Sequence, residues 1–267
     1  MNSNVSQSLL TTEDTSPVTV INPAGASSFL LIGDHAGKAV PARLGSLGLG
    51  EADLSRHIGW DIGVGELGAL LAERLDAVFV RQTYSRLVID CNRSHDQPDV
   101  IATVSDGTLV PGNAGLTEAE RAARFAEIHA PYHATIAAEL ARRDALAMPT
   151  VVIALHSFTP MMSGPMRDQA RPWQIGILHD GGDTVFAHAL LDVLRREPNL
   201  TVGDNEPYRM DLIDYTIPRH AYPARGYAEI EIRQDLLGST ADCDAWADRL
   251  ARLLPLALER AEASERA

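Results

Sequence analysis

The sequence Phe29-Leu30-Leu31-Ile32-Gly33-Asp34-His35-Ala36-Gly37 carries a histidine directly after a short apolar run that ends in glycine. A similar arrangement recurs in Val151-Val152-Ile153-Ala154-Leu155-His156-Ser157. Short apolar runs with boundaries of this kind are typical of buried β-strands. In open α/β sheets, ligands bind just beyond the carboxyl ends of the strands. We therefore expect His35 and His156 to face one crevice at that edge of a sheet.

Strands and helices are expected to alternate along the chain. The patterns predict strands at Ser28–Gly33, Ala77–Gln82, Arg86–Cys91, Thr150–Leu155, Gln174–Leu178, Leu200–Gly203 and Tyr227–Arg233. They predict helices at Trp60–Leu75 and from Thr240 to about Glu262. A further helix is expected from a capping box of Thr117 and Glu120 to about Leu146, interrupted at Pro131, and another after an N-cap at Asp183. This alternation predicts an α/β fold with a mixed, mainly parallel sheet and helices on both faces.

Length and composition predict one α/β domain. The chain has 267 residues, and we expect residues 1–17 to form a flexible arm before a single domain at residues 18–267. The net charge of 23 − 36 = −13 disfavours a nucleic-acid partner. The sequence predicts a cytoplasmic protein without a membrane partner. It has two cysteines outside any CxxC pair, no apolar stretch near the ~20 residues of a membrane span and no basic leader.

His35, Asp61 and His156 are the candidate metal ligands. Two imidazoles and one carboxylate leave a coordination position open for water, which is the usual form of a catalytic zinc site. One Zn²⁺ per chain is expected on this donor set. Taken singly, each residue has a simpler interpretation, because the histidines suit hydrogen-bonded loops and Asp61 suits a helix N-cap.

Glu231 is the candidate general base. Alternation in the strand Tyr227–Arg233 turns Glu229, Glu231 and Arg233 to one side and the isoleucines to the other. A partly buried glutamate beside a metal suits proton transfer from water to a leaving amine. Glu231 is preferred because it lies nearer the carboxyl end of the strand. The alternative is a solvated strand face with a Glu–Arg pair.

Arg86 and Arg93 are expected at the two ends of the strand Arg86–Cys91. Guanidinium groups bind carboxylates in a bidentate manner, so they would suit a small substrate with one or two carboxylates. The alternative is salt bridging to Asp90 or Asp96.

The remaining histidines carry weaker signals. His129 and His133 have the i, i+4 spacing of HExxH zinc sites, but Ala130 stands where that motif has glutamate. His133 and His220 are therefore candidates for substrate contacts rather than metal ligands, and His179 is left open. Glycine-rich nucleotide loops and a serine nucleophile elbow are absent from the sequence.

With these residues the chain resembles the N-formylglutamate amidohydrolase family from about Phe29 to Leu237. The matching motifs are Asp34–Gly37, Trp60–Val64, Tyr84–Arg93, Leu155–Pro160, Asn205–Tyr208 and Ile230–Leu236. The order His, Asp, His, Glu is also similar to that of zinc amidases and carboxypeptidase-like hydrolases. The resemblance implies an α/β three-layer sandwich of the phosphorylase/hydrolase-like, zinc exopeptidase-like kind.

The resemblance also implies an activity. A metal held by His35, Asp61 and His156, with Glu231 as base and Arg93 beside the oxyanion, would hydrolyse the N-formyl group of a small acidic amino acid such as N-formyl-L-glutamate. Arg86, Asn92 and Arg233 would anchor its carboxylates. Another N-acyl amino acid, a cyclic amide or a peptidoglycan amide remains an alternative substrate, and a non-catalytic small-molecule binding module is the alternative of another class. The sequence leaves a homo-oligomer open.

Overall fold

A seven-stranded sheet forms the centre of the computed structural model, which describes residues 8–163, 170–210 and 214–266. The strands lie in the order β1-β3-β2-β6-β9-β7-β8. Their bounds are β1 Val18–Ile21, β2 Phe29–Gly33, β3 Val78–Gln82, β6 Val151–Phe158, β7 Ile175–Leu178, β8 Val202–Asp204 and β9 Tyr227–Arg233. The sheet is mixed and mainly parallel, as the sequence predicts, because only the β1–β3 and β7–β9 pairs are antiparallel.

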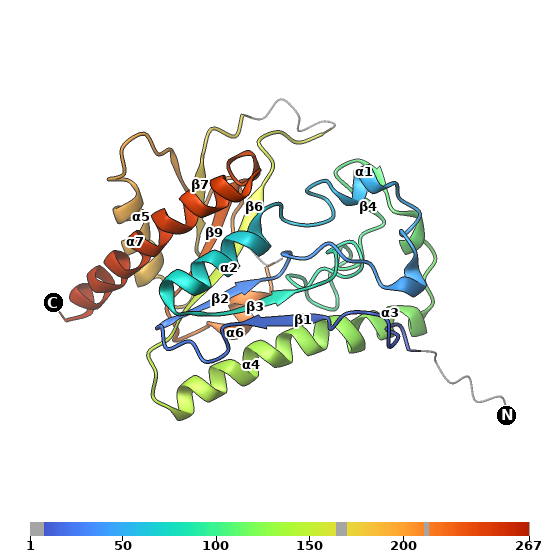
Figure 1. The fold of residues 1–267 in the computed structure, drawn as a ribbon, viewed down its shortest axis with the longest axis horizontal. Helices are drawn as coiled ribbons and strands as arrows, with labels where there is room; N and C mark the ends of the chain where they lie inside the picture. The colour runs from blue at the N-terminus through green and yellow to red at the C-terminus, as the bar shows by residue number, and fades with distance from the viewer. Residues whose placement is uncertain (1–7, 164–169, 211–213, 267) are drawn as a thin grey trace.

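Helices cover both faces of this sheet, which confirms the three-layer α/β fold (Figure 1). On one face lie α2 (Val64–Leu75), α5 (Val185–Leu194) and α7 (Thr240–Glu265), and on the other lie α4 (Ala130–Ala145) and α6 (Thr216–His220). Leu31 of β2 packs with the first group and Leu30 with the second. Strands buried on both faces read as continuous apolar runs, which explains the two segments quoted at the outset.

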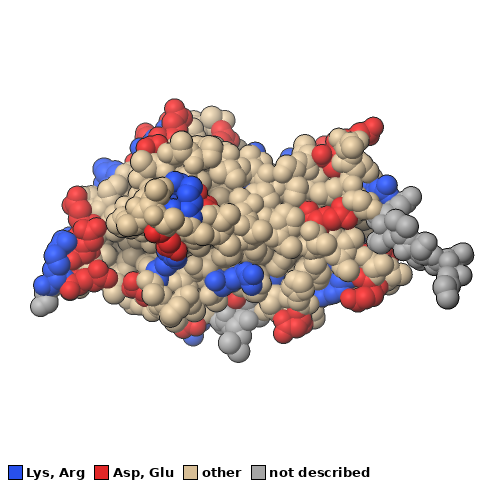
Figure 2. All heavy atoms as spheres, turned by 90° about the horizontal axis from the view of Figure 1, so that it is seen from below, with Lys and Arg blue, Asp and Glu red and all other residues tan. Residues whose placement is uncertain are grey.

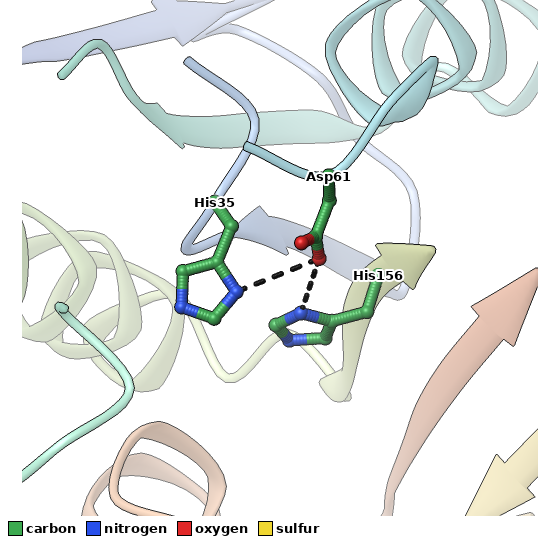
Figure 3. A group of neighbouring side chains, drawn as sticks. All are labelled: His35, Asp61 and His156. Atoms are coloured by element: carbon green, nitrogen blue, oxygen red, sulfur yellow. Dashed lines mark hydrogen bonds and ion pairs between the residues drawn. The ribbon is translucent and has the colours of Figure 1, made fainter. Parts of the chain in front are cut away.

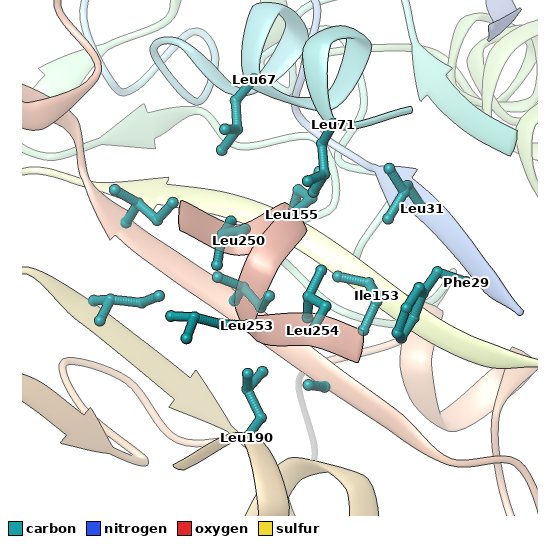
Figure 4. Close-up of a cluster of buried hydrophobic side chains, with 14 of the residues drawn as sticks. Phe29, Leu31, Leu67, Leu71, Ile153, Leu155, Leu190, Leu250, Leu253 and Leu254 are labelled. Carbon is teal, nitrogen blue, oxygen red and sulfur yellow. The ribbon is translucent and has the colours of Figure 1, made fainter. Parts of the chain in front are cut away.

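The larger apolar core lies between the sheet and the helices α2, α5 and α7 (Figure 4). Leu67 and Leu71 of α2 and Leu250, Leu253 and Leu254 of α7 meet there above the strands. Each buried side chain of this size contributes about 1.5–3 kcal/mol through the removal of apolar surface from water. The core therefore fixes the positions of β2, β6 and β9, whose carboxyl ends carry the candidate site.

The chain between β3 and α4 packs as loops around a separate apolar cluster that includes Leu47, Val88, Ile101 and Phe125. The short elements of this region and of the segment before α2 are η1 Ala42–Leu44, α1 Glu51–Leu54, β4 Val104–Ser105, β5 Thr108–Leu109 and η2 Pro111–Asn113. They are followed by α3 (Glu118–Arg124), a π-helical turn η3 (Phe125–His129) and α4. The predicted capping box of Thr117 and Glu120 is confirmed, and the helix is irregular just before Pro131. A further 3₁₀ turn, η5 (Gln234–Leu236), follows β9.

The predicted strand Arg86–Cys91 is wrong. The segment is a series of turns, and its residues Leu87, Val88 and Ile89 pack into the loop cluster. Its last residue, Cys91, packs in the core on the sheet. The carbonyl groups of the segment are bound by side chains: Asn113 Nδ2 donates to Leu87 O (2.8 Å) and Arg124 Nη1 donates to Val88 O (2.8 Å). Arg86 and Arg93 therefore do not lie at the two ends of a strand.

Two other boundaries differ in ways that affect the site. The helix expected from Trp60 begins only at Val64, because Gly63 is its N-cap in a left-handed conformation (φ 83°). Asp61 consequently lies in the turn before α2 and does not cap it. Strand β6 continues to Phe158, so His156 lies within the strand instead of after it. The antiparallel edge strand β1 was not predicted.

Residues 8–17 of the expected N-terminal arm lie against the domain. The backbone N–H groups of Leu9 and Leu10 donate to the Glu127 carboxylate (2.7 and 2.8 Å), and Tyr84 Oη donates to Thr15 O (2.7 Å). Residues 1–7 of that arm lie outside the described residues.

Surface charges are mixed where they can be followed. On the described part of the face in Figure 2, acidic and basic groups are interspersed without a continuous basic surface. No helix of the described chain has the length and apolar character that crossing a lipid bilayer requires.

Candidate metal centre

The structure brings His35, Asp61 and His156 together at the carboxyl edge of the sheet (Figure 3). His35 follows β2, Asp61 lies in the turn before α2, and His156 lies near the end of β6. Asp61 Oδ2 is 3.5 Å from His35 Nδ1 and 2.9 Å from His156 Nδ1. All three side chains are buried, so the cluster is shielded from solvent.

This donor set fits a divalent metal. Tetrahedral zinc with ligands at about 2.0–2.1 Å separates its ligand atoms by about 3.3 Å, which the distances here approach. His35 Nδ1 is buried and has no hydrogen-bond partner among the described residues. Burial alone would raise the pKa of Asp61, but the neighbouring His35 and His156 outweigh it and lower that pKa. An ionised carboxylate and two imidazoles therefore converge on one point.

Glu231 faces this cluster from the neighbouring strand. Its Cα is the register partner of His156 across the parallel β6–β9 pair. Glu231 is 6% exposed, and its Oε2 has no hydrogen-bond partner in the described structure. Burial raises the pKa of Glu231 to about 8. A carboxyl group with a pKa near neutrality can both accept and return a proton.

Glu229 lies on the same face of β9 and is also buried. Burial, reinforced by Asp214, raises the pKa of Glu229 well above its ordinary value. The interpretation of this strand face as solvated is therefore wrong, because both carboxyl groups are removed from water.

A cavity of about 300 Å³ opens over these groups. Its wall contains the three candidate metal ligands and both glutamates of β9, together with His57, Arg86, Asn92, Arg93, Ser157, Phe158, Thr159, Leu178, Tyr208, Arg209 and Asp214. Such a volume suits a small molecule.

The arginines of this wall differ in their partners. Arg86 donates to Asp90 Oδ2 (2.6 and 3.1 Å), and its Nη1 is 3.5 Å from Asp61 Oδ1. The expected alternative, a salt bridge to Asp90, is therefore present for Arg86. This pairing nevertheless leaves the Arg86 guanidinium beside the candidate metal ligands. Arg93 pairs with Asp99 (2.9 Å).

Arg209 makes no hydrogen bond or ion pair with another described residue, and its side chain is exposed. It is therefore the uncommitted cation among the described residues of the cavity wall.

Arg233 and Asn92 are less available to a substrate. Arg233 pairs with Asp235 (2.8 Å) and is not part of the cavity wall. Asn92 lines the cavity, but its Oδ1 accepts the N–H groups of Tyr215 and Thr216 (3.0 and 2.9 Å) at the start of α6. Its amide therefore anchors that helix.

His133 and His220 form a buried pair outside the cavity wall. His133 Nδ1 is 2.9 Å from His220 Nε2, and His133 Nε2 donates to Cys91 O (2.9 Å). The structure does not bring them to the candidate site. His129 is bound to Arg93 O (3.0 Å), and His179 pairs with Asp204 (2.8 Å).

Several residues near the candidate ligands were not predicted from the sequence. Asp34 and Asp90 contact the outer nitrogens of the two histidines, and His57 and Arg209 complete the cavity wall. A signal existed for the two aspartates, because both lie inside the motifs quoted for the family resemblance. Nothing in the local pattern distinguishes Arg209.

The fold and site define an α/β protein with a buried His-Asp-His cluster able to hold a metal at the edge of its sheet. The family model for N-formylglutamate amidohydrolase matches residues 27–238. The chain therefore belongs to the N-formylglutamate amidohydrolase family, which confirms the resemblance.

Three individual proteins are similar to this chain over different lengths. The gene product Atu2144 from Agrobacterium tumefaciens is 36% identical, with a TM-score of 0.89 over 95% of this chain and 99% of that one. An N-formylglutamate amidohydrolase from Ralstonia eutropha JMP134 shares the fold, at 24% identity and a TM-score of 0.62 over 94% and 99% of the two chains. An N-formylglutamate deformylase from Pseudomonas aeruginosa is 39% identical over 84 residues, which span 28% of this chain and only 32% of that protein.

Proposed function

We propose that this chain is a metal-dependent amidohydrolase that removes the N-formyl group from a small acidic amino acid, with N-formyl-L-glutamate as the leading substrate. The observation that carries the proposal is the buried His35–Asp61–His156 cluster with Glu231 facing it inside a small cavity. Membership of the family supports the reaction class, and two similar proteins, an N-formylglutamate deformylase and an N-formylglutamate amidohydrolase, suggest the substrate.

His35, Asp61 and His156 would hold one zinc ion, which would polarise the formyl carbonyl and acidify water. Glu231 accepts a proton from the attacking water while the oxygen of that water bonds to the formyl carbon. The same carboxyl group then donates that proton to the departing amine nitrogen as the C–N bond breaks, so the products are formate and the free amino acid. Burial raises the pKa of Glu231 above that of an ordinary glutamate, which favours proton transfer in both directions by this one group.

Arg86 is the best-placed cation for the negative charge that develops on the carbonyl oxygen. Its guanidinium lies 3.5 Å from Asp61, whereas Arg93 pairs with Asp99 farther along the loop. We therefore give Arg86 the oxyanion role that the sequence suggested for Arg93. Preorganised charge of this kind is often the largest contribution to catalysis.

Substrate carboxylates are assigned to the outer wall. Arg209 is uncommitted among the described residues, and Arg93 lies on the same wall with two carboxylate partners, Asp99 at 2.9 Å and Asp214 at 3.8 Å. Two cations on one wall suit a substrate with two carboxylates.

The deciding experiment measures formate release from N-formyl-L-glutamate before and after treatment with a chelator, together with the metal content of the protein. We expect about one zinc per chain, loss of turnover with its removal and recovery when zinc is returned. A panel of N-acetyl and larger N-acyl amino acids, cyclic amides and muropeptides in the same assay separates the alternative substrates. A chain that holds no stoichiometric metal and hydrolyses none of them would be the binding module instead.

A further inference from the structure

Each candidate metal-ligating imidazole has a carboxylate oxygen within 3.5 Å of both of its nitrogens. The Nδ1 atoms of His35 and His156 face Asp61, at 3.5 and 2.9 Å. On the outer side, His35 Nε2 lies 2.7 Å from Asp90 Oδ1, and His156 Nε2 lies 3.4 Å from Asp34 Oδ2. Asp34 and Asp90 are 1% and 4% exposed, so neither carboxylate is there to meet solvent.

The two outer carboxylates are themselves held in place. Arg86 and the Asn92 N–H (2.9 Å) donate to Asp90, and Thr216 Oγ1 donates to Asp34 Oδ1 (2.8 Å). In each carboxylate at least one oxygen is left facing an imidazole. A buried carboxylate with fixed partners has little freedom to turn away, and the ring that it contacts shares that constraint.

The arrangement crosses over in the sequence. Asp34 precedes His35 in the sequence, yet its carboxylate contacts His156. His35 is contacted instead by Asp90, from the loop after β3. Figure 3 shows that the two rings approach Asp61 from different elements. The dipeptide Asp34-His35 therefore contributes to the placement of both imidazoles.

We propose that Asp90 and Asp34 are positioning residues that fix the tautomers of His35 and His156. A carboxylate accepts a hydrogen bond, so it holds the ring proton on Nε2 and leaves the Nδ1 lone pair directed at the metal. Asp90 has the stronger effect because it makes a hydrogen bond of 2.7 Å to His35 Nε2. Asp34 Oδ2 and His156 Nε2 lie 3.4 Å apart as an ion pair, and neither atom has a hydrogen-bond partner among the described residues. The inference rests on the proposed metal-dependent function and adds two residues to it.

The test compares zinc binding in Asp90→Asn, Asp34→Asn and the control Asp99→Asn. Asp99 also pairs with an arginine of the same loop, and no hydrogen bond or ion pair joins it to an imidazole of the described residues. Zinc affinity, measured by competition with a chromophoric chelator, is expected to fall about 10–100-fold in Asp90→Asn and about 10-fold in Asp34→Asn. It is expected to stay within about 2-fold of the parent value in Asp99→Asn.

A second measurement needs no variant. In the zinc-loaded parent protein, ¹⁵N NMR of the histidine rings is expected to show Nδ1 coordinated and Nε2 protonated for both His35 and His156. Coordination through Nε2, or unchanged zinc affinity in both Asp90→Asn and Asp34→Asn, overturns the inference while the metal-dependent function stands. A parent protein that binds no zinc overturns the function and this inference with it.

Discussion

Glu231 acquires its proposed chemistry from its position in the sheet. The parallel register places it opposite His156, and the antiparallel pair with β7 places Gly176 on its other side. A Cβ atom at Gly176 would collide with the backbone carbonyl of Glu206, so glycine lets that segment pack against the sheet beside Glu231. Burial then raises its pKa to about 8, whereas an exposed glutamate titrates near 4.3.

Replacing Glu231 with glutamine removes the proton acceptor and retains the shape of the side chain. We expect kcat for N-formyl-L-glutamate to fall by about 10²–10⁴-fold, because that is the usual contribution of a positioned acid–base group. Zinc content is expected to stay at the parent value, since Glu231 is not one of the three ligands. Glu229→Gln, on the same strand face, is the matched control, and a larger loss there would reverse the assignment.

Arg209 supplies a second prediction at the level of a single residue. Loss of a charged hydrogen bond costs about 1.5–3 kcal/mol, so Arg209→Ala is expected to raise KM about 10–100-fold with little change in kcat. Arg209→Lys keeps the charge and should recover part of the affinity. A fall in kcat at constant KM would show that Arg209 acts on the reaction and not on binding.

Among the elements, those defined by local patterns were predictable from the sequence. The strand Tyr227–Arg233 has the predicted bounds, and the capping box at Thr117 is present. The two buried strands were predicted because apolar side chains on both faces leave an uninterrupted run. The two candidate histidine ligands follow from those strands. Asp61 was predicted as the third candidate at the start of a helix, whereas the structure places it in the turn before α2.

The segment Arg86–Cys91 shows what local pattern does not contain. Its apolar residues are as dense as those of a buried strand, but they pack against loops that lie far away in the sequence. Its backbone groups are bound by Asn113 and Arg124, so it needs no neighbouring strand. Local pattern likewise does not predict the contacts of Asp34 and Asp90 in the candidate site, because these depend on which loops return to the edge of the sheet.

Arg124 of α3 is expected to stabilise this loop strongly. It is 1% exposed and donates to Val88 O, Asn113 Oδ1 and Gly112 O. Arg124→Met fills similar space but leaves those acceptors without a donor, so we expect the free energy of unfolding to fall by about 2–4 kcal/mol. Denaturant titration measures the change. Arg142→Met, at a more exposed position in α4, should stay within about 0.5 kcal/mol, and equal losses would contradict a special role for Arg124.

At the scale of the whole molecule, the pair His133–His220 ties the outer helical layer to the loop that carries the site. His133 belongs to α4 and His220 to α6, and His133 donates to the backbone of Cys91. Burial, followed by His129, lowers the pKa of His133 to about 3, and burial, followed by Arg219, lowers that of His220 to about 4. Both rings are therefore neutral in the folded protein at pH 7.

This pair predicts how stability depends on pH. In the unfolded chain each histidine titrates near 6.5, so between pH 6.5 and about 4 the unfolded state binds more protons and stability falls as the pH falls. Above pH 6.5 neither state is protonated and the contribution is constant. We expect each histidine to lower the free energy of unfolding by about 1–2 kcal/mol between pH 7 and pH 5. The free energy of unfolding should therefore fall less between pH 7 and pH 5 in the double variant His133→Gln/His220→Gln than in the parent protein. This comparison holds even if the variant is already less stable at pH 7. Urea unfolding at the two pH values measures this difference, with exposed His188→Gln as control; a double variant that follows the parent curve would show that the pair is not the source of acid sensitivity.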